Sequence, residues 1–440
     1  MRGNLIKNII IGIDGGTFNH IIPLLRKNLL PNFETLIKKG FYSYLKVTVP
    51  PVTIPSFPCI FSGLTVEDLG YCTFVIPSKG IFSSDLWKQK SVLSINNLKV
   101  FSLNLPSSYP AWEINGEMIT GLMSPHLNSK ICFPQSLIKT IPNNWIIDGI
   151  NIDQTFQAFN MKKEYFYEQL KRDFDLLIYV IRIPDCASHH PKIRLKNTTK
   201  AIEKGYIEID KFFGDILNKI DFDNLFVISD HGLKLYQYEF NIKRFLERKG
   251  LIFQNKDRVS KILSILIKIS GYFNYKFLNT TYMHNKFKDL IKKIKIFKSN
   301  HETESNSTKF IHFYSNYGGI FLSKDDKGKR DRIRRVLLNS KYVKEVLIYN
   351  SPSLPDLIVI LKDKYLYSVK SSIFIQNRFN SINHSEKGIF IAFGKNIRNE
   401  FMKETNYIDF APTLLNLYNL KKLDHMRGNS LKILKDIDLI

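Results

Sequence analysis

The chain contains 440 residues, of which 44% are hydrophobic, 13% aromatic and 24% charged. This composition is typical of a globular protein and excludes a collagen-like, coiled-coil or disordered chain. No stretch reaches the roughly 20 apolar residues of a membrane-spanning helix. The first apolar run, Ile9–Ile13, is too short for a signal peptide and ends at an acidic residue. We therefore expect a cytoplasmic protein whose four cysteines, none of them in a CxxC pair, stay reduced.

The net charge is strongly positive, with 64 Lys and Arg against 40 Asp and Glu, or +24. Half of this excess lies in residues 241–300, where 15 basic residues oppose three acidic ones. Such a block can attract nucleic acid, an anionic membrane surface or an anionic substrate. A simpler explanation is codon bias, because the chain is also rich in Ile and Asn. The charge pattern alone therefore leaves these partners open.

Short apolar runs alternate with helical patterns along most of the chain. Asn8–Ile13 predicts a buried strand, residues 29–40 a helix, and residues 41–49 a second strand. A proline-rich segment then precedes a helix that we expect over Ser56–Ser62. Three further apolar runs, at residues 176–183, 225–228 and 388–393, predict strands. A long helical pattern lies between the first two of these runs, at residues 200–220. This alternation predicts an α/β fold with a mostly parallel central sheet and helices on both faces.

Residues 241–308 follow a different pattern. Apolar residues recur at helical spacing over residues 259–298 with lysines between them, and a polar linker follows at residues 299–307. We expect a basic helical insertion or cap here, set within a catalytic domain formed by residues 1–240 and 309–440. The pattern fits a cap that draws in anionic substrate, which we favour, and also a peripheral contact with anionic lipid.

Residues able to bind a metal gather at the predicted strand ends. In open α/β sheets, ligand sites form beyond the carboxyl ends of the strands. The chain offers three aspartates and three histidines there, namely Asp14, Asp185, Asp230, His189, His231 and His384. Taken singly, each is more simply a turn, cap or surface residue. Together they predict a cation site, because mixed carboxylate and imidazole ligands suit zinc, with manganese as the alternative.

Thr53 is the candidate nucleophile. It lies in the segment Pro50–Ser56, just before the predicted helix. A helix N-terminus stabilises anions through its free N–H groups and its dipole. A threonine hydroxyl becomes a useful nucleophile when a metal or a base lowers its pKa.

The whole set of motifs resembles the alkaline phosphatase superfamily, in particular its type I phosphodiesterase and nucleotide pyrophosphatase branch. The resemblance extends over nearly the entire chain. The matching segments are Ile11–Gly16, Leu30–Phe33, Pro50–Ser56, Asn104–Pro106, Asp185–His189, Ser229–Gly232, His384 with Gly388 and Gly394, and Asp409–Thr413. Pro50–Ser56, which contains Thr53, is the most specific of them.

The resemblance implies a site for two divalent metal ions, with Zn²⁺ favoured and Mn²⁺ the alternative. One ion would be held by four residues, Asp14, Thr53, Asp230 and His231, and the other by three, Asp185, His189 and His384. Thr53 would attack phosphorus and form a phospho-threonine intermediate. The expected activity is hydrolysis of phosphodiester bonds, including those of nucleotide pyrophosphates.

Departures from the family pattern keep other activities open. Leu69 stands where many relatives have histidine, and Phe74 stands where nucleotide pyrophosphatases have asparagine, which weakens the nucleotide assignment. We do not expect a formylglycine sulfatase, because Thr53–Phe57 lacks both the convertible Cys or Ser and the Arg of that class. The alternatives are a phosphomonoesterase or phosphomutase, or a non-catalytic binder of anionic partners. Since no Arg flanks Thr53, we favour a phosphodiester over a monoester. We do not expect nucleic acid as the partner.

Overall fold

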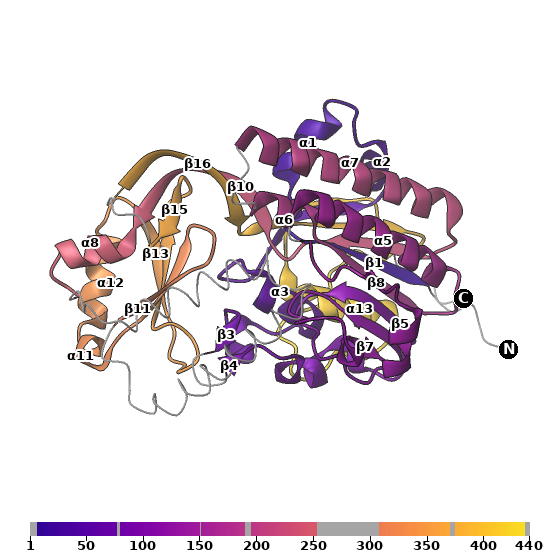
Figure 1. The fold of residues 1–440 in the computed structure, drawn as a ribbon, viewed down its shortest axis with the longest axis horizontal. Helices are drawn as coiled ribbons and strands as arrows, with labels where there is room; N and C mark the ends of the chain where they lie inside the picture. Colours follow the sequence, from indigo (N-terminus) through magenta and orange to yellow (C-terminus); the bar gives the residue numbers. More distant parts are fainter. Residues whose placement is uncertain are drawn as a thin grey trace. The chain divides into compact units, whose positions relative to one another are not determined.

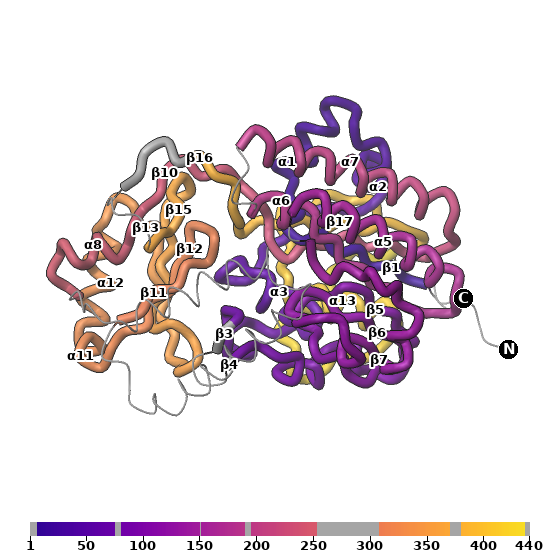
Figure 2. Tube along the Cα trace, in the orientation of Figure 1, coloured from indigo at the N-terminus to yellow at the C-terminus, as the bar shows by residue number. Residues whose placement is uncertain are grey.

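The computed structural model describes residues 7–76, 80–149, 151–189, 195–252, 308–369 and 375–435. The chain forms two compact units. Unit 1 consists of Met1–Leu69, Phe82–Leu233 and Ser385–Ile440, and unit 2 of Gly70–Ile81 and Lys234–His384. The chain therefore leaves unit 1 and returns to it twice, first for the short segment Gly70–Ile81 and then for the long segment Lys234–His384, and Figure 2 shows the path of the trace.

Within the described residues, unit 1 is built on a nine-stranded sheet (Figure 1). In spatial order the strands are β18 (Phe401–Asn406), β2 (Phe41–Lys46), β17 (Lys387–Gly394), β9 (Asn224–Ile228), β1 (Asn8–Ile13), β8 (Leu176–Ile181), β5 (Val100–Leu105), β6 (Gly116–Thr120) and β7 (Cys132–Phe133). All of them run in one direction except β17 and β7. The predicted mostly parallel sheet is thus confirmed.

Helices cover both faces of this sheet (Figure 1). One layer contains α1 (Phe18–Leu25), α2 (Pro31–Lys39), α5 (Ile152–Leu170), α6 (Ile183–Ser188) and α7 (Leu195–Lys219). The other contains α3 (Thr53–Ser62) and α13 (Phe410–Leu417), with α4 (Val66–Leu69) following α3. Short 3-10 helices occur at Ser84–Leu86, Lys88–Lys90, Val92–Ser94, Ser129–Ile131, Gln135–Thr140 and Tyr407–Asp409. Because both faces are covered, β1, β8 and β9 are buried along their whole length, which explains their unbroken apolar sequences.

Helix α3 begins three residues earlier than the sequence predicts. The expected helix starts at Ser56, whereas the structure starts it at Thr53, with Val52 as the N-cap. The difference arises because Pro55 occupies the first turn, where a backbone N–H has no intrahelical partner and proline is therefore tolerated. As a result, Thr53 is the first residue of a buried helix rather than part of the loop before it.

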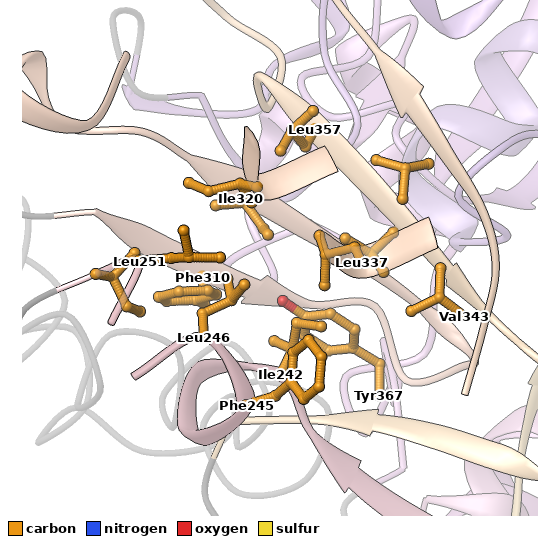
Figure 3. Packing of buried hydrophobic residues seen from close by; sticks show 14 of the residues in the cluster. Ile242, Phe245, Leu246, Leu251, Phe310, Ile320, Leu337, Val343, Leu357 and Tyr367 are labelled. Atoms are coloured by element: carbon orange, nitrogen blue, oxygen red, sulfur yellow. The ribbon is translucent and has the colours of Figure 1, made fainter. Parts of the chain in front are cut away.

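Unit 2 has its own hydrophobic core. A four-stranded antiparallel sheet has the order β11 (Lys309–His312), β12 (Tyr317–Phe321), β14 (Leu357–Leu361) and β13 (Val343–Ile348). A second sheet has the order β15 (Tyr365–Ser368), β10 (Gly232–Asn241) and β16 (Ile375–Ser385). The helices are α8 (Ile242–Arg248), α11 (Lys324–Lys327) and α12 (Arg330–Leu338), and β3 (Val75–Ile76) pairs with β4 (Gly80–Ile81). Figure 3 shows Ile242 and Phe245 of α8, Leu337 of α12 and Tyr367 of β15 in one cluster.

The boundaries of these units differ from the domain boundaries expected from the sequence. Residues 309–384 group with residues 234–252 in unit 2 rather than with the large sheet. Most of the predicted helical insertion, residues 241–308, lies outside the described residues, and the cap remains a prediction. All four cysteines are buried and free, as expected. Among the described residues, no helix is both long and apolar enough to cross a membrane.

A buried carboxylate from α7 holds the start of α2. Asp210 accepts hydrogen bonds from the backbone N–H groups of Asn32 (3.3 Å) and Phe33 (2.8 Å), and from the Asn32 side chain (2.9 Å). The N-cap residue of α2, Leu30, provides no side-chain bond of its own. The Leu-Pro-Asn-Phe sequence at this point therefore presents two free backbone donors, and a residue distant in sequence satisfies them.

We expect Asp210→Ala to lower the free energy of unfolding by about 1–3 kcal/mol, because two buried N–H groups lose their acceptor. The matched control is Glu208→Ala on the same helix, which removes a surface ion pair with Lys211 and should cost at most about 1 kcal/mol. Denaturant unfolding followed by circular dichroism measures both losses. Equal losses in the two variants would contradict this role for Asp210.

Candidate functional site

Three aspartates lie at one edge of the central sheet because of the parallel strand order. β1 pairs with β8 on one side and β9 on the other, with Ile13 opposite Ile181 and Gly12 opposite Ile228. Asp14 follows β1 directly, while Asp230 and Asp185 follow the ends of β9 and β8 within a few residues. All three are buried. The structure thus places the three carboxylates at one edge of the sheet.

Asp14, Asp230 and His231 form a compact group of candidate ligands. Each offers a ligand atom within 4.8 Å of those of the other two. His231 Nε2 lies 3.3 Å from Asp14 Oδ1 and 3.4 Å from Asp230 Oδ2. The second oxygen of Asp230 accepts the backbone N–H of Gly15 at 3.2 Å, which fixes the orientation of that carboxylate. One oxygen of each aspartate and one ring nitrogen thus converge.

The electrostatics of this group favour a bound cation. Burial, together with repulsion from Asp14, raises the pKa of Asp230 well above its ordinary value. Although burial opposes charge on the ring, the carboxylates of Asp230, Asp14 and Asp185 raise the pKa of His231 to about 10. Its Nδ1 lies 3.1 Å from the carbonyl oxygen of Gly232, which can only accept, so Nδ1 carries a hydrogen and Nε2 faces the carboxylates. Nε2 is therefore the nitrogen that could ligate a metal once it releases its proton.

Thr53 lies beside the same group. Its side chain is buried, and its hydroxyl donates to Asp14 Oδ1 at 3.4 Å and lies 3.3 Å from His231 Nε2. As the first residue of α3, it also sits at the positive end of a ten-residue helix. Gly12 allows α3 to approach β1 closely, since a Cβ there would lie 3.3 Å from the Phe57 ring and 2.9 Å from Val180. The hydroxyl is thus held next to the candidate ligands at a helix end that favours anions.

Asp185 and His189 lie one helical turn apart, as the sequence predicts. His189 Nε2 is 3.1 Å from Asp185 Oδ1. Asp185 also belongs to a second group of candidate ligands with His231 and His384. His189 lies outside both groups, although its ring touches the carboxylate of Asp185. The neighbouring His190 lies outside the described residues.

His384 is the last residue of unit 2 before the chain returns to unit 1. It is bonded to Ser385, the first residue of the last segment of unit 1. Within unit 1, a Cβ added to Gly232 would lie 2.7 Å from Ser385 Oγ. The segment that follows His384 therefore passes directly beside the residue that follows His231.

Arg182 is a buried charged residue beside the candidate ligands that the sequence analysis does not identify. It follows β8, its side chain is only 4% exposed, and it donates to three buried carboxylates. Nε lies 2.7 Å from Asp14 Oδ2, Nη2 lies 3.1 Å from Asp185 Oδ2, and Nη1 binds Asp148. The one available signal was an arginine immediately after a buried apolar strand, three residues before a candidate ligand.

Comparisons with known proteins agree with this architecture. Residues 8–373 match the family model described as type I phosphodiesterase/nucleotide pyrophosphatase. The comparison with curated proteins finds no match.

Similar solved structures include murine ectonucleotide pyrophosphatase/phosphodiesterase 5, at 14% identity and a TM-score of 0.56. An inactive threonine-to-alanine variant of the murine protein in complex with AMP has 13% identity and a TM-score of 0.55. The human protein of the same name has 15% identity and a TM-score of 0.53. Each comparison covers 98% of this chain and all of the other, and at these identities the likeness concerns the fold.

The family model spans most of the chain, from the first strand of the large sheet into unit 2. The chain therefore belongs to the type I phosphodiesterase/nucleotide pyrophosphatase family of the alkaline phosphatase superfamily and is a phosphoric ester hydrolase.

Proposed function

We propose that this hydrolase cleaves phosphodiester bonds at a site for two divalent cations, with Thr53 as the nucleophile. The observation that carries the proposal is the position of the Thr53 hydroxyl, 3.4 Å from Asp14 Oδ1 and 3.3 Å from His231 Nε2 at the N-terminus of α3. A nucleophile beside candidate metal ligands and at an anion-stabilising helix end is the arrangement that phosphoryl transfer requires.

The residues present fit two cations. Asp14, Asp230 and His231, joined by Thr53 Oγ1, would hold one, while Asp185, His189 and His384 would hold the other. Mixed carboxylate and imidazole donors favour Zn²⁺, with Mn²⁺ as the alternative. The bound cations would neutralise charge on the phosphoryl oxygens and lower the pKa of the Thr53 hydroxyl.

The protein's own groups would orient the reaction. Asp14 Oδ1 accepts the hydrogen of Thr53, so the lone pairs of the hydroxyl are free to face phosphorus. Attack forms the bond between Thr53 Oγ1 and phosphorus while the hydroxyl proton passes to Asp14 Oδ1, and it breaks the bond to the leaving oxygen, which takes up a proton and departs as an alcohol. Water then adds to phosphorus and displaces Thr53 Oγ1, which recovers its proton, and the phosphate monoester is released. The N-terminal end of α3 stabilises the negative charge of the phosphoryl group in both steps.

A phosphodiester suits this site better than a monoester. A monoester carries an extra negative charge, which usually requires an additional arginine or other cation at the phosphate. Arg182, the arginine beside the site, directs its donors to Asp14, Asp148 and Asp185 rather than toward Thr53. The murine relative whose inactive threonine variant was solved with AMP supports a threonine nucleophile and a nucleotide-like substrate for this chain as well.

The first test is the metal content of the purified chain. After reconstitution with zinc and removal of excess metal, elemental analysis should find about two equivalents per chain, as a two-metal site requires. Asp230→Asn should remove at least one equivalent, because a buried ligand loses its charge. The control Asp325→Asn, on the exposed side of α11, should keep both. A wild-type content below one equivalent would contradict the two-cation site.

The second test concerns the nucleophile. Thr53→Ala should lower turnover of bis(p-nitrophenyl) phosphate by orders of magnitude, because water must then attack the diester directly. Metal content should change little, since Asp14, Asp230 and His231 remain. Thr35→Ala provides the control, because that hydroxyl only bonds the Pro31 carbonyl on the surface of α2. Near-normal turnover in the Thr53 variant would exclude it as the nucleophile.

The third test concerns substrate class. We expect kcat/KM for bis(p-nitrophenyl) phosphate to exceed that for p-nitrophenyl phosphate, because Arg182, the described arginine beside the site, already donates to three carboxylates rather than to a phosphate. Both substrates release the same chromophore, so absorbance measures them on one scale. A preference for the monoester that disappears in Thr53→Ala would instead favour the phosphomonoesterase alternative.

A further inference from the structure

The guanidinium group of Arg182 lies at the centre of a buried network in unit 1. Its three bonded carboxylates are those of Asp14, Asp148 and Asp185, whose side chains are between 0% and 8% exposed. Two of these residues are candidate ligands for different cations, Asp14 for the first and Asp185 for the second. Arg182 is therefore the described side chain that bridges the two halves of the site.

The two carboxylate oxygens of Asp14 have the same kinds of neighbour as those of Asp185. In Asp14, Oδ2 accepts from Arg182, while Oδ1 lies near His231 Nε2 and Thr53 Oγ1. In Asp185, Oδ2 accepts from Arg182, while Oδ1 lies 3.1 Å from His189 Nε2 and 3.8 Å from His231 Nε2. In both residues the Oδ2 atom thus accepts a hydrogen bond from Arg182, and the Oδ1 atom faces the imidazole rings.

We propose that Arg182 is a positioning residue that restricts Asp14 and Asp185 to one oxygen each for their cations. A carboxylate can bind a cation through one oxygen or both. The planar guanidinium fork fixes the angle between its donors, so Arg182 also links the orientations of the two ligands. This inference rests on the proposed two-cation function and assigns to Arg182 the control of its coordination.

The surroundings of Arg182 hold the guanidinium in place. Asp148 binds Nη1, whereas Asp14 and Asp185 accept from Nε and Nη2. Lys162 of α5, also buried, donates to the Asn104 side chain at 2.8 Å and to the Ile147 carbonyl at 2.6 Å. Asp148, Lys162, Arg182 and Asn104 line one small cavity of about 20 Å³. Such a supporting shell is what keeps ligands at a fixed geometry.

The test uses the full chain reconstituted with cobalt(II), whose visible absorption reports coordination number. Arg182→Met removes the guanidinium, so the Oδ2 atoms of Asp14 and Asp185 become free to bind cobalt as well. We expect weaker absorption than in the wild type, as a higher coordination number produces. Arg182→Lys should give the same change in smaller measure, because one ammonium cannot span both carboxylates. The control is Arg172→Met, which removes a surface arginine that also forms two bonds, both to Glu117, and should leave the spectrum unchanged.

A stability measurement separates positioning from simple structural support. Without metal, the carboxylates around residue 182 lose their compensating charge in Arg182→Met, and the Tm should fall by several degrees or more. With cobalt bound, the cations compensate that charge and the fall in Tm should be clearly smaller. Arg172→Met should show equal Tm changes with and without cobalt.

The possible outcomes are distinct. If Arg182→Met does not fold without metal, Arg182→Lys carries the test, because it keeps the charge. Cobalt spectra that match the wild type in both Arg182 variants overturn the proposal, whatever the stability. A wild-type chain that binds no cobalt overturns the two-cation function and this inference together. A wild-type chain that binds two equivalents, with unchanged spectra in the variants, overturns this inference alone.

Discussion

The constraint on which the site depends is the burial of several carboxylates at one sheet edge. Asp14, Asp185 and Asp230 are each almost fully buried, and like charges at such distances repel strongly in a medium of low polarity. In unit 1 the compensating groups are Arg182, which bonds two of them, and His231, whose ring lies near all three. Divalent cations would compensate the remaining negative charge. The buried carboxylates would therefore account both for the need for cations and for the proposed chemistry.

The parallel order of the strands makes this concentration of charge possible. Because β9, β1 and β8 are adjacent and run in one direction, three consecutive strand ends open at the same edge. The helices that follow then add further groups, with Asp185 on α6 and Thr53 at the start of α3. Backbone groups add to the hydrogen bonding of these buried side chains, since the N–H of Gly15 donates to Asp230 and the carbonyl of Gly232 accepts from His231.

Under the proposed function, we expect the core of unit 2 and the basic segment to bear on substrate choice, whereas His384, the last residue of unit 2, would belong to the candidate ligands. The core of unit 2, formed by α8, α12 and the antiparallel sheet, does not include the residues that would hold the cations. The strands β10, which begins after His231, and β16, which contains His384, connect this unit to unit 1. Functions of one superfamily diverge through such added elements while the reactive core is retained. The natural leaving group would therefore be recognised by residues other than those that attack phosphorus.

The sequence by itself determined the class of fold and most of the candidate site. Unbroken apolar runs such as Asn8–Ile13 identify buried parallel strands, and polar residues at their ends mark one edge, because both signals are local. The start of α3 at Thr53 was missed, since tolerance of Pro55 depends on its place within the first turn. The grouping of residues 309–384 in unit 2 and the three bonds of Arg182 were decided only by tertiary structure. Contacts between residues as distant in sequence as Asp14 and Arg182 leave no periodic signal, and the partner of a buried charge is set by the packing that surrounds it.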